Sequence, residues 1–209
     1  MLLVQSRPTV GRMTAKLPAP VVLTGRHVRL EPLTRAHVPD LFAAGGGDEE
    51  VWRWIPVPVP RTEAEMAAVI DARLADRACT PFAVVAPADG RAVGVSCYFD
   101  ASAAEEQLEI GGTWYGRAVW RTAVNTEAKL LLLRHAFEDL GMGRVCWKTD
   151  HLNERSQQAI RRLGASYEGT FRRAKRRPDG SWRDSVYFSM LADEWPAARA
   201  RLSERLAAG

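Results

Sequence analysis

Residues 92–164 contain an order of elements that strongly restricts the fold. The segments AVGVSCYF (92–99) and QLEIGGTWY (107–115) predict two neighbouring strands. A helix from about residue 125 to residue 140 follows, then the strand RVCWKTD (144–150) and a helix over 153–163. Strands that pair directly, followed by strand and helix in alternation, predict a mixed sheet.

The predicted sheet has a weak point where its antiparallel and parallel halves meet. The two strands at this junction are the one that ends at Tyr115 and the one that ends at Asp150. They can splay apart and leave a gap. Gly111 and Gly112 lie within the first of these strands, and paired glycines there indicate a bulge or a close backbone approach to a ligand.

The elements around this centre complete one domain. Glycines, prolines and the Asp89-Gly90 pair separate them, and Thr62 with Glu65 predicts a capped helix start. Residues 21–33 predict a strand turning at Gly25. Short helices are expected over 35–44 and 48–55, a strand over 82–86, a hairpin turning at 178–180, and a closing helix over 194–206. The predicted class is α/β (α+β), with a splayed, mixed, mostly antiparallel sheet and helices on both faces.

Composition bounds the kind of protein. The 209 residues, 46% hydrophobic and 26% charged, suit one globular domain over 21–209, after a flexible tail at 1–20 in which Met13 is an alternative start. The net charge of +4 is too mild to favour nucleic acid as a partner. The sequence offers no membrane span, metal-ligand spacing or CxxC pair, which fits a reducing cytoplasm without a metal. Its three cysteines are expected to be small buried hydrophobes: Cys79, Cys97 and Cys146.

The loop before the central helix is a candidate anion site. Residues 120–126 lead into a helix N-terminus, where free backbone N–H groups and the helix dipole favour phosphate. Phosphate loops usually carry glycines, and this loop has none. The alternative is that Asn125 and Thr126 merely cap the helix.

Several short stretches together resemble one known family. They are NTEAK, HAFEDLG, RV, TDHLNERSQQAIRRLGA with its N-x-x-S, then EG, DG and RDSVYFSML followed by EW. In this order they resemble the RimJ/RimL-like branch of the GNAT superfamily, which consists of acyl-CoA-dependent N-acetyltransferases. The resemblance covers roughly residues 21 to 202.

The resemblance implies that acetyl-CoA lies in the gap and that its pyrophosphate is held by the loop. The family pattern Q/R-x-x-G-x-G/A has its small positions at Arg121 and Ala123 here, so the first glycine is replaced. Asn153 is implied to contact the pantetheine arm and Ser156 the sulfur, while Ile160 stands where many members place a tyrosine acid. The expected pyrophosphate loop is Arg121, Thr122, Ala123, Val124, Asn125 and Thr126.

The family transfers the acetyl group directly, without an acyl-enzyme. Glu109 is the candidate base. The alternative, which the sequence favours equally, is that Glu109 is a strand carboxylate that faces solvent and has no catalytic role. A backbone N–H of Gly112 or Thr113 is expected to hold the oxyanion. Trp52 and Trp54 either line the acceptor groove or pack in the core. The basic run 171–177 is either a solvated strand or a contact for the CoA 3′-phosphate or an acidic substrate.

Three functions remain open at this point. The favoured one is acetylation of a protein or peptide N-terminal α-amine, with a homodimer allowed. The second is transfer of an acetyl or succinyl group to a small amine or antibiotic. The third is a ribosome- or RNA-associated module with an inactive acyl-CoA fold.

Overall fold

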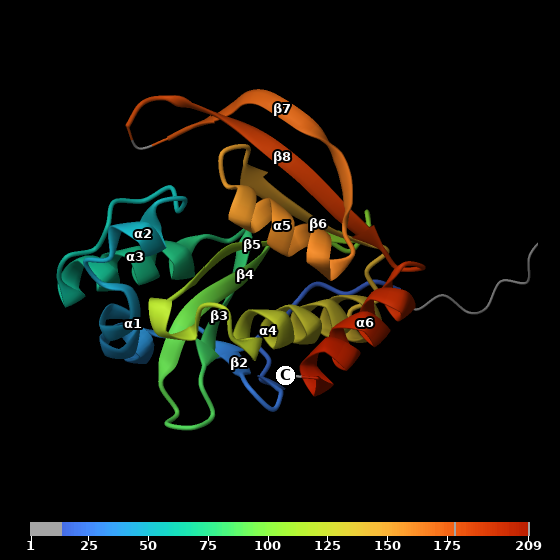
Figure 1. Ribbon diagram of the computed structural model, residues 1–209, viewed down its shortest axis with the longest axis horizontal. Coiled ribbons are helices and arrows are strands. Elements are labelled where there is room, and N and C mark those ends of the chain that lie inside the picture. Colours follow the sequence, from blue (N-terminus) through green and yellow to red (C-terminus); the bar gives the residue numbers. More distant parts are fainter. Residues whose placement is uncertain (1–13, 178, 209) are drawn as a thin grey trace, which may run out of the picture.

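The computed structural model describes residues 14–177 and 179–208. An eight-stranded sheet in the order β1-β2-β3-β4-β5-β6-β8-β7 runs through the molecule (Figure 1). Every neighbouring pair is antiparallel except β5 and β6, which are parallel. The predicted mixed, mostly antiparallel sheet is therefore confirmed. Its strands are β1 Leu23–Thr24, β2 Arg29–Pro32, β3 Cys79–Val85, β4 Ala92–Ser102, β5 Gln107–Tyr115, β6 Arg144–Asp150, β7 Ser166–Arg176 and β8 Trp182–Leu191.

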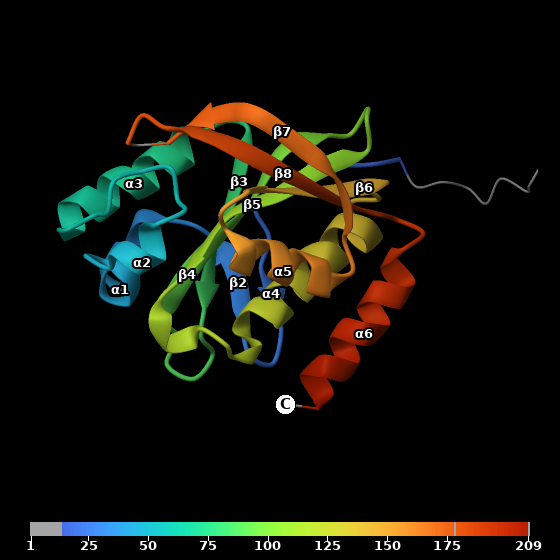
Figure 2. The same ribbon diagram turned by 45° about the horizontal axis from the view of Figure 1, so that its top comes forward.

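Helices cover both faces of the sheet, as predicted. One group is α1 (Val38–Gly45), α2 (Glu49–Trp52) and α3 (Glu63–Ala75). The other is α4 (Ala123–Arg134), α5 (Glu154–Leu163) and α6 (Trp195–Ala207). Figure 2 shows the two groups on opposite sides of the central strands, with the β7–β8 hairpin passing above them. In the part of the chain that the structure describes, no helix is long and apolar enough to cross a bilayer.

Each helix group packs against its own hydrophobic cluster. On the α4–α6 side, Leu131 and Leu132 of α4 pack with Phe188 of β8 and Trp195 of α6. On the α1–α3 side, a smaller cluster includes Met66 and Ile70 of α3. A fully buried side chain of this size stabilises the fold by roughly 1.5–3 kcal/mol. The two clusters fix the sheet between its helices and so position the strand ends that border the expected gap.

Two helix starts refine the sequence-based boundaries. Helix α4 begins at Ala123, and the Thr122 hydroxyl accepts from Val124 N as its N-cap. Asn125 and Thr126 therefore do not cap it, which corrects that alternative. At its far end α4 continues as a wide π-helical turn over His135–Asp139. Helix α5 starts at the N-cap Asn153 and ends at left-handed Gly164, as the sequence predicts.

Part of the expected N-terminal tail contacts the domain. Ala15 is buried in the larger cluster, and Lys16 N donates to Leu140 O at 2.8 Å. Residues 1–13, which include the alternative start Met13, lie outside the described residues, as does Pro178 of the predicted 178–180 turn. Gly180 in that turn has φ of 82°, a conformation that glycine adopts without strain.

Candidate active site

Strands β5 and β6 separate after a short pairing. Their parallel register covers only Gln107–Glu109 against Arg144–Cys146. Strand β5 then continues to Tyr115 and β6 to Asp150, while β4 and β8 hold their outer edges. Beyond the paired residues, the backbone groups of β5 and β6 that face each other are not hydrogen-bonded across the sheet, so a ligand between the strands could bind to them. The gap predicted between the strand ending at Tyr115 and the strand ending at Asp150 is therefore present.

A β-bulge lies on β5 at the mouth of this gap. Cys97 pairs with Gly111 and Val95 with Trp114, so Gly112 and Thr113 stand opposite the single residue between them on β4. Gly112 has φ of 57°, in the left-handed region that favours glycine. A bulge leaves its extra residue outside the regular ladder and re-aims the backbone. The bulge therefore includes Gly112 and Thr113, the two residues whose backbone N–H groups the sequence predicts to hold the oxyanion.

The Glu109 carboxylate turns back over the bulge. A Cβ on Gly111 would lie 2.9 Å from Glu109 Oε1, so glycine leaves room for the carboxylate. Lys148 of β6 contacts it from across the gap, with Nζ 2.6 Å from Oε2. Lys148 also lies 3.7 Å from Asp100. The Glu109 side chain is only 12% exposed, so it is not a solvent-facing strand carboxylate.

Burial and this carboxylate act on Lys148 in opposite directions. Burial lowers the pKa of Lys148, and the hydrogen bond and charge of Glu109 outweigh it, so that the pKa is raised overall. The lysine is therefore protonated near neutral pH. It holds the carboxylate in place as a charged partner, not as a second base.

A lysine in the middle of α4 reaches the same bulge from the other side of the sheet. Lys129 Nζ donates to Thr113 Oγ1 at 2.6 Å and to Ser96 Oγ at 3.0 Å. The side chain is buried, and burial lowers its pKa from 10.5 to about 7. Lys129 is not among the residues predicted from the sequence. Its only signal was a lysine followed directly by four leucines, in a helix whose neighbouring positions are apolar.

The loop before α4 lacks glycine, yet one of its residues has a backbone conformation that is typical of glycine. Arg121 has φ of 62°, a left-handed conformation that is uncommon for residues other than glycine. The resemblance places the family's first glycine at this position, and Arg121 has a backbone conformation that glycine favours. Arg121 and Thr122 are exposed and Ala123 and Asn125 half-buried, whereas Val124 and Thr126 point inward. Of these six residues, Arg121, Thr122 and Asn125 have polar side chains that are at least partly exposed.

Helix α5 faces this loop across the gap. Asn153 Oδ1 accepts from Ser156 N at 3.0 Å, so the asparagine caps the helix and its amide nitrogen is not used by that bond. The Arg155 guanidinium stacks 4.1 Å from the centre of the Trp120 ring and links α5 to the loop. Ile160, at the position where the resemblance implies a tyrosine acid in many members, is buried in the core.

The two candidate acceptor tryptophans have different surroundings. Trp52 is 2% exposed, donates from Nε1 to Gly45 O at 2.8 Å and packs on Trp114. Trp52 is therefore a core residue and does not line an acceptor groove. Trp54 is half-buried, lies under the Arg53 guanidinium and lines a cleft beneath the β7–β8 hairpin.

The three cysteines lie in or near the sheet interior. Cys97 is fully buried, and Cys79 and Cys146 are half-buried and free. Burial raises the pKa of Cys146 to about 11, with the Glu109 charge acting in the same direction. Such a thiol is a poor nucleophile at neutral pH.

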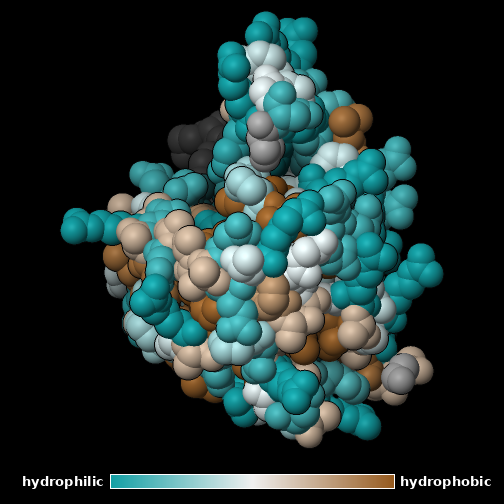
Figure 3. Space-filling model, turned by 90° about the vertical axis from the view of Figure 1, so that its left-hand side faces the viewer, coloured by the Kyte–Doolittle hydropathy of each residue, from teal (hydrophilic) through white to brown (hydrophobic). Residues whose placement is uncertain are grey.

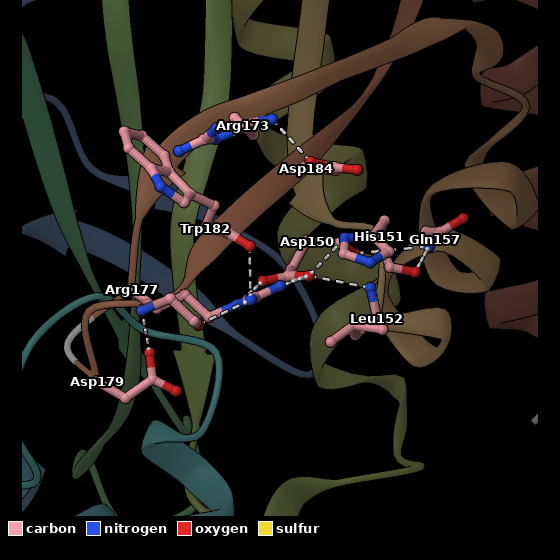
Figure 4. Close-up of polar contacts among 10 residues, drawn as sticks. Asp150, His151, Leu152, Gln157, Arg173, Arg177, Asp179, Trp182 and Asp184 are labelled. Carbon is pink, nitrogen blue, oxygen red and sulfur yellow. Dashed lines mark hydrogen bonds and ion pairs between the residues drawn. The ribbon is translucent and has the colours of Figure 1, made fainter.

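At the end of β6 a buried carboxylate organises the hairpin. Asp150 accepts from Arg177 Nε at 2.7 Å and Nη2 at 2.9 Å, and from Leu152 N at 3.0 Å (Figure 4). Burial raises the pKa of Asp150, but these hydrogen bonds and the Arg177 charge outweigh it and lower the pKa overall. The basic run 171–177 therefore has a partly structural role, because its last arginine, Arg177, forms the ion pair with Asp150.

Comparison with known proteins identifies the family. The model for the acetyltransferase (GNAT) domain matches residues 27–166. The chain belongs to the GNAT superfamily. It is an acyl-CoA-dependent acetyltransferase of the RimJ/RimL type. No match is found among curated proteins.

Solved GNAT structures share the whole domain. An acetyltransferase structure from T. thermophilus is 40% identical, with a TM-score of 0.84 over 91% of this chain and 100% of that one. A GCN5-related N-acetyltransferase from Brucella melitensis is 31% identical, with a TM-score of 0.88 over 92% and 88%. RimJ from Mycobacterium smegmatis, in complex with CoA-disulfide, is 22% identical, with a TM-score of 0.71 over 85% and 88%, and shows the fold alone.

Proposed function

We propose that this GNAT enzyme transfers an acetyl group from acetyl-CoA to the N-terminal α-amine of a protein or peptide in the cytoplasm, by direct attack in a ternary complex. The observation that carries the proposal is the carboxylate of Glu109, shielded from water and held by Lys148 at 2.6 Å beside the β5 bulge.

The residues around the gap suit acetyl-CoA. The helix N-terminus at Ala123 and the exposed Arg121 and Thr122 would hold the pyrophosphate, since a helix start and a cation both favour phosphate. Asn153 has an amide nitrogen left for the pantetheine arm. When bound, acetyl-CoA supplies the thioester carbonyl and the thiolate leaving group.

Three groups of the protein would then carry out the separate steps of the transfer. Glu109 takes the proton of the acceptor amine, directly or through a water, so that the nitrogen can attack. The backbone N–H groups of Gly112 and Thr113 donate to the oxygen that gains charge, an interaction typically worth ~3 kcal/mol. The Ser156 hydroxyl hydrogen-bonds the departing sulfur and relays a proton from water.

The kind of base indicates the kind of amine. An α-amine has a pKa near ~8, so its deprotonation at pH 7 costs roughly 1–1.5 kcal/mol. A lysine amine near ~10.4 would cost about 4–5 kcal/mol. A carboxylate is a weak base, and it suits the first task better than the second.

A pH–rate profile tests the residue and the acceptor together. Glu109→Gln should lower the rate ~10²–10⁴-fold at pH 7 with an N-terminal peptide, and raising the pH should partly restore it, levelling off near pH 8–9. Asp100→Asn is the matched control, because Asp100 is the other carboxylate near Lys148. A panel with lysine peptides, free amino acids, polyamines and aminoglycosides, and with succinyl-CoA as donor, compares the other acceptors and donors. A wild-type rate at every pH would exclude Glu109 as the base.

A further inference from the structure

A cationic cleft lies between the segment after α2 and the β7–β8 hairpin. Figure 3 shows this side of the molecule, with hydrophilic residues covering the protruding hairpin. The charged residues that line the cleft are Arg53, Asp150, Lys175, Arg176, Arg177 and Arg183. Five cations against one carboxylate give these side chains a net charge of +4. A concave surface with such an excess attracts anions.

The single carboxylate does not balance the cleft. Both Asp150 oxygens accept from Arg177, and the side chain is 4% exposed, so it has little left for a second cation. Arg176 is exposed, and its guanidinium lies 4.9 Å from the centre of the Trp182 ring. Arg53 has a 3.5 Å ion pair with Glu50, in which both side chains are largely exposed and the interaction is weak.

Arg183 has a hydrogen-bond donor without a partner among the described residues. Its Nε is buried and makes no hydrogen bond to the residues that the structure describes. Burial lowers the pKa of Arg183, while the nearby charges of Asp150 and Glu109 act in the opposite direction. Arg183 is half-buried as a residue, and burying a charged donor without a partner costs free energy that a ligand anion would offset.

The cleft adjoins the candidate base. Alternation along β6 puts Lys148 and Asp150 on one sheet face, and their partners on β8 are Tyr187 and Ser185. Arg183 follows the same alternation, two residues from Ser185. It therefore shares the face of Glu109, to which Lys148 is bonded. The cleft opens on the α1–α3 side, since Arg53 directly follows α2, whereas the expected CoA loop begins α4 on the other side.

We propose that this cleft binds an acidic group of the acceptor, so that the preferred acceptors are amines with a carboxylate or phosphate a few bonds from the reactive nitrogen. Arginine pairs with both groups in a bidentate geometry. The inference rests on the proposed function, because it places the amine at Glu109. Two sources share this chemistry: a peptide with an acidic residue next to its N-terminus, and a small amino acid with a free carboxylate.

Matched acceptors separate these sources. The first pair is a peptide with Asp at its second position and the same peptide with Asn. The second pair is a free amino acid and its amide. With saturating acetyl-CoA, the acidic member of at least one pair should have a kcat/KM at least about tenfold higher at low salt, and the ratio should shrink as salt is added. Calorimetry of each acceptor with the CoA-loaded protein gives the same ratio without turnover.

Three variants test whether the preference for acidic acceptors depends on the cleft. Arg183→Gln and the exposed Arg53→Gln should each lower the acidic-to-neutral ratio severalfold. Arg172→Gln removes one charge from the same hairpin outside this cleft and should leave the ratio unchanged. Arg53→Gln keeps the test valid if Arg183→Gln fails to fold.

Equal kcat/KM and equal affinity within both pairs would overturn the proposal, even if neutral peptides are acetylated and the proposed function stands. A preference for the free amino acid alone would keep the cleft and overturn the N-terminal function. A rise in the KM for acetyl-CoA in Arg183→Gln, with an unchanged acceptor ratio, would assign the cations to a CoA phosphate instead. RNA binding weakened equally by Arg172→Gln and Arg183→Gln would indicate a general polyanion surface and contradict the proposal.

Discussion

Lys129 Nζ lies 2.6 Å from the hydroxyl oxygen of Thr113, a residue of the β5 bulge. The helix that begins at the expected CoA loop thus holds the strand segment that is expected to bind the oxyanion. The second bond, to Ser96 on β4, fixes the lysine to the strand opposite the bulge. Lys129 touches the bulge from the core side, so it is a positioning residue and not a group that meets substrate.

Lys129→Met should therefore weaken catalysis more than cofactor binding. Methionine fills similar space but releases the Thr113 hydroxyl, and small misplacements of a catalytic donor cost about tenfold or more in rate. We expect kcat to fall by about that factor, with the KM for acetyl-CoA changed less. Steady-state kinetics with varied acetyl-CoA measure both. A larger change in KM than in kcat would place the role of Lys129 in the cofactor site.

Stability should also depend on pH through Lys129. Burial lowers its pKa from 10.5 to about 7, so between these values the unfolded chain binds more protons than the folded one. The free energy of unfolding should rise as the pH increases from about 7 towards 10.5, by up to ~1.4 kcal/mol per pH unit from this residue. Below pH 7 both states carry the proton, and the cost of burying the charge is fully present. Urea unfolding at pH 6.5, 8 and 9.5 should show this slope in the wild type and lose it in Lys129→Met.

The order of elements and the gap could be predicted because they depend on local patterns. Alternation marks β5, and Gly164 with φ of 97° ends α5 as a glycine C-cap does. The bonds of Lys129 and of Arg177 could not be predicted, since each joins residues that are distant in the sequence. Arg177 and Asp150 are 27 positions apart. The predicted start of α4 differs by two residues because the sequence does not distinguish Asn125 from Thr122 as the cap.

The α4 start offers a charge test with little change of shape. Asn125→Asp is nearly isosteric and lies in the first turn of α4, where a carboxylate favours the helix by ~0.3–1 kcal/mol. Folding stability should be equal or higher, whereas affinity for acetyl-CoA should fall at least about tenfold, or ~1.4 kcal/mol, by repulsion of the pyrophosphate. Ser203→Asp, exposed on α6, adds the same charge elsewhere. Unchanged affinity by calorimetry would remove this loop from the cofactor site.

Asn153 has two separable tasks, because its oxygen caps α5 and its nitrogen is free of that bond. Asn153→Asp keeps an equally good cap but loses the N–H donors that we expect to bind the pantetheine arm. Thermal stability should stay near the wild type while the KM for acetyl-CoA rises about 3- to 10-fold, the loss of a hydrogen bond worth ~0.5–1.5 kcal/mol. Asn153→Ala removes both tasks, so it should show a similar KM and also lose ~1 kcal/mol of stability. If Asn153→Asp keeps the wild-type KM and only Asn153→Ala is impaired, Asn153 is a helix cap and nothing more.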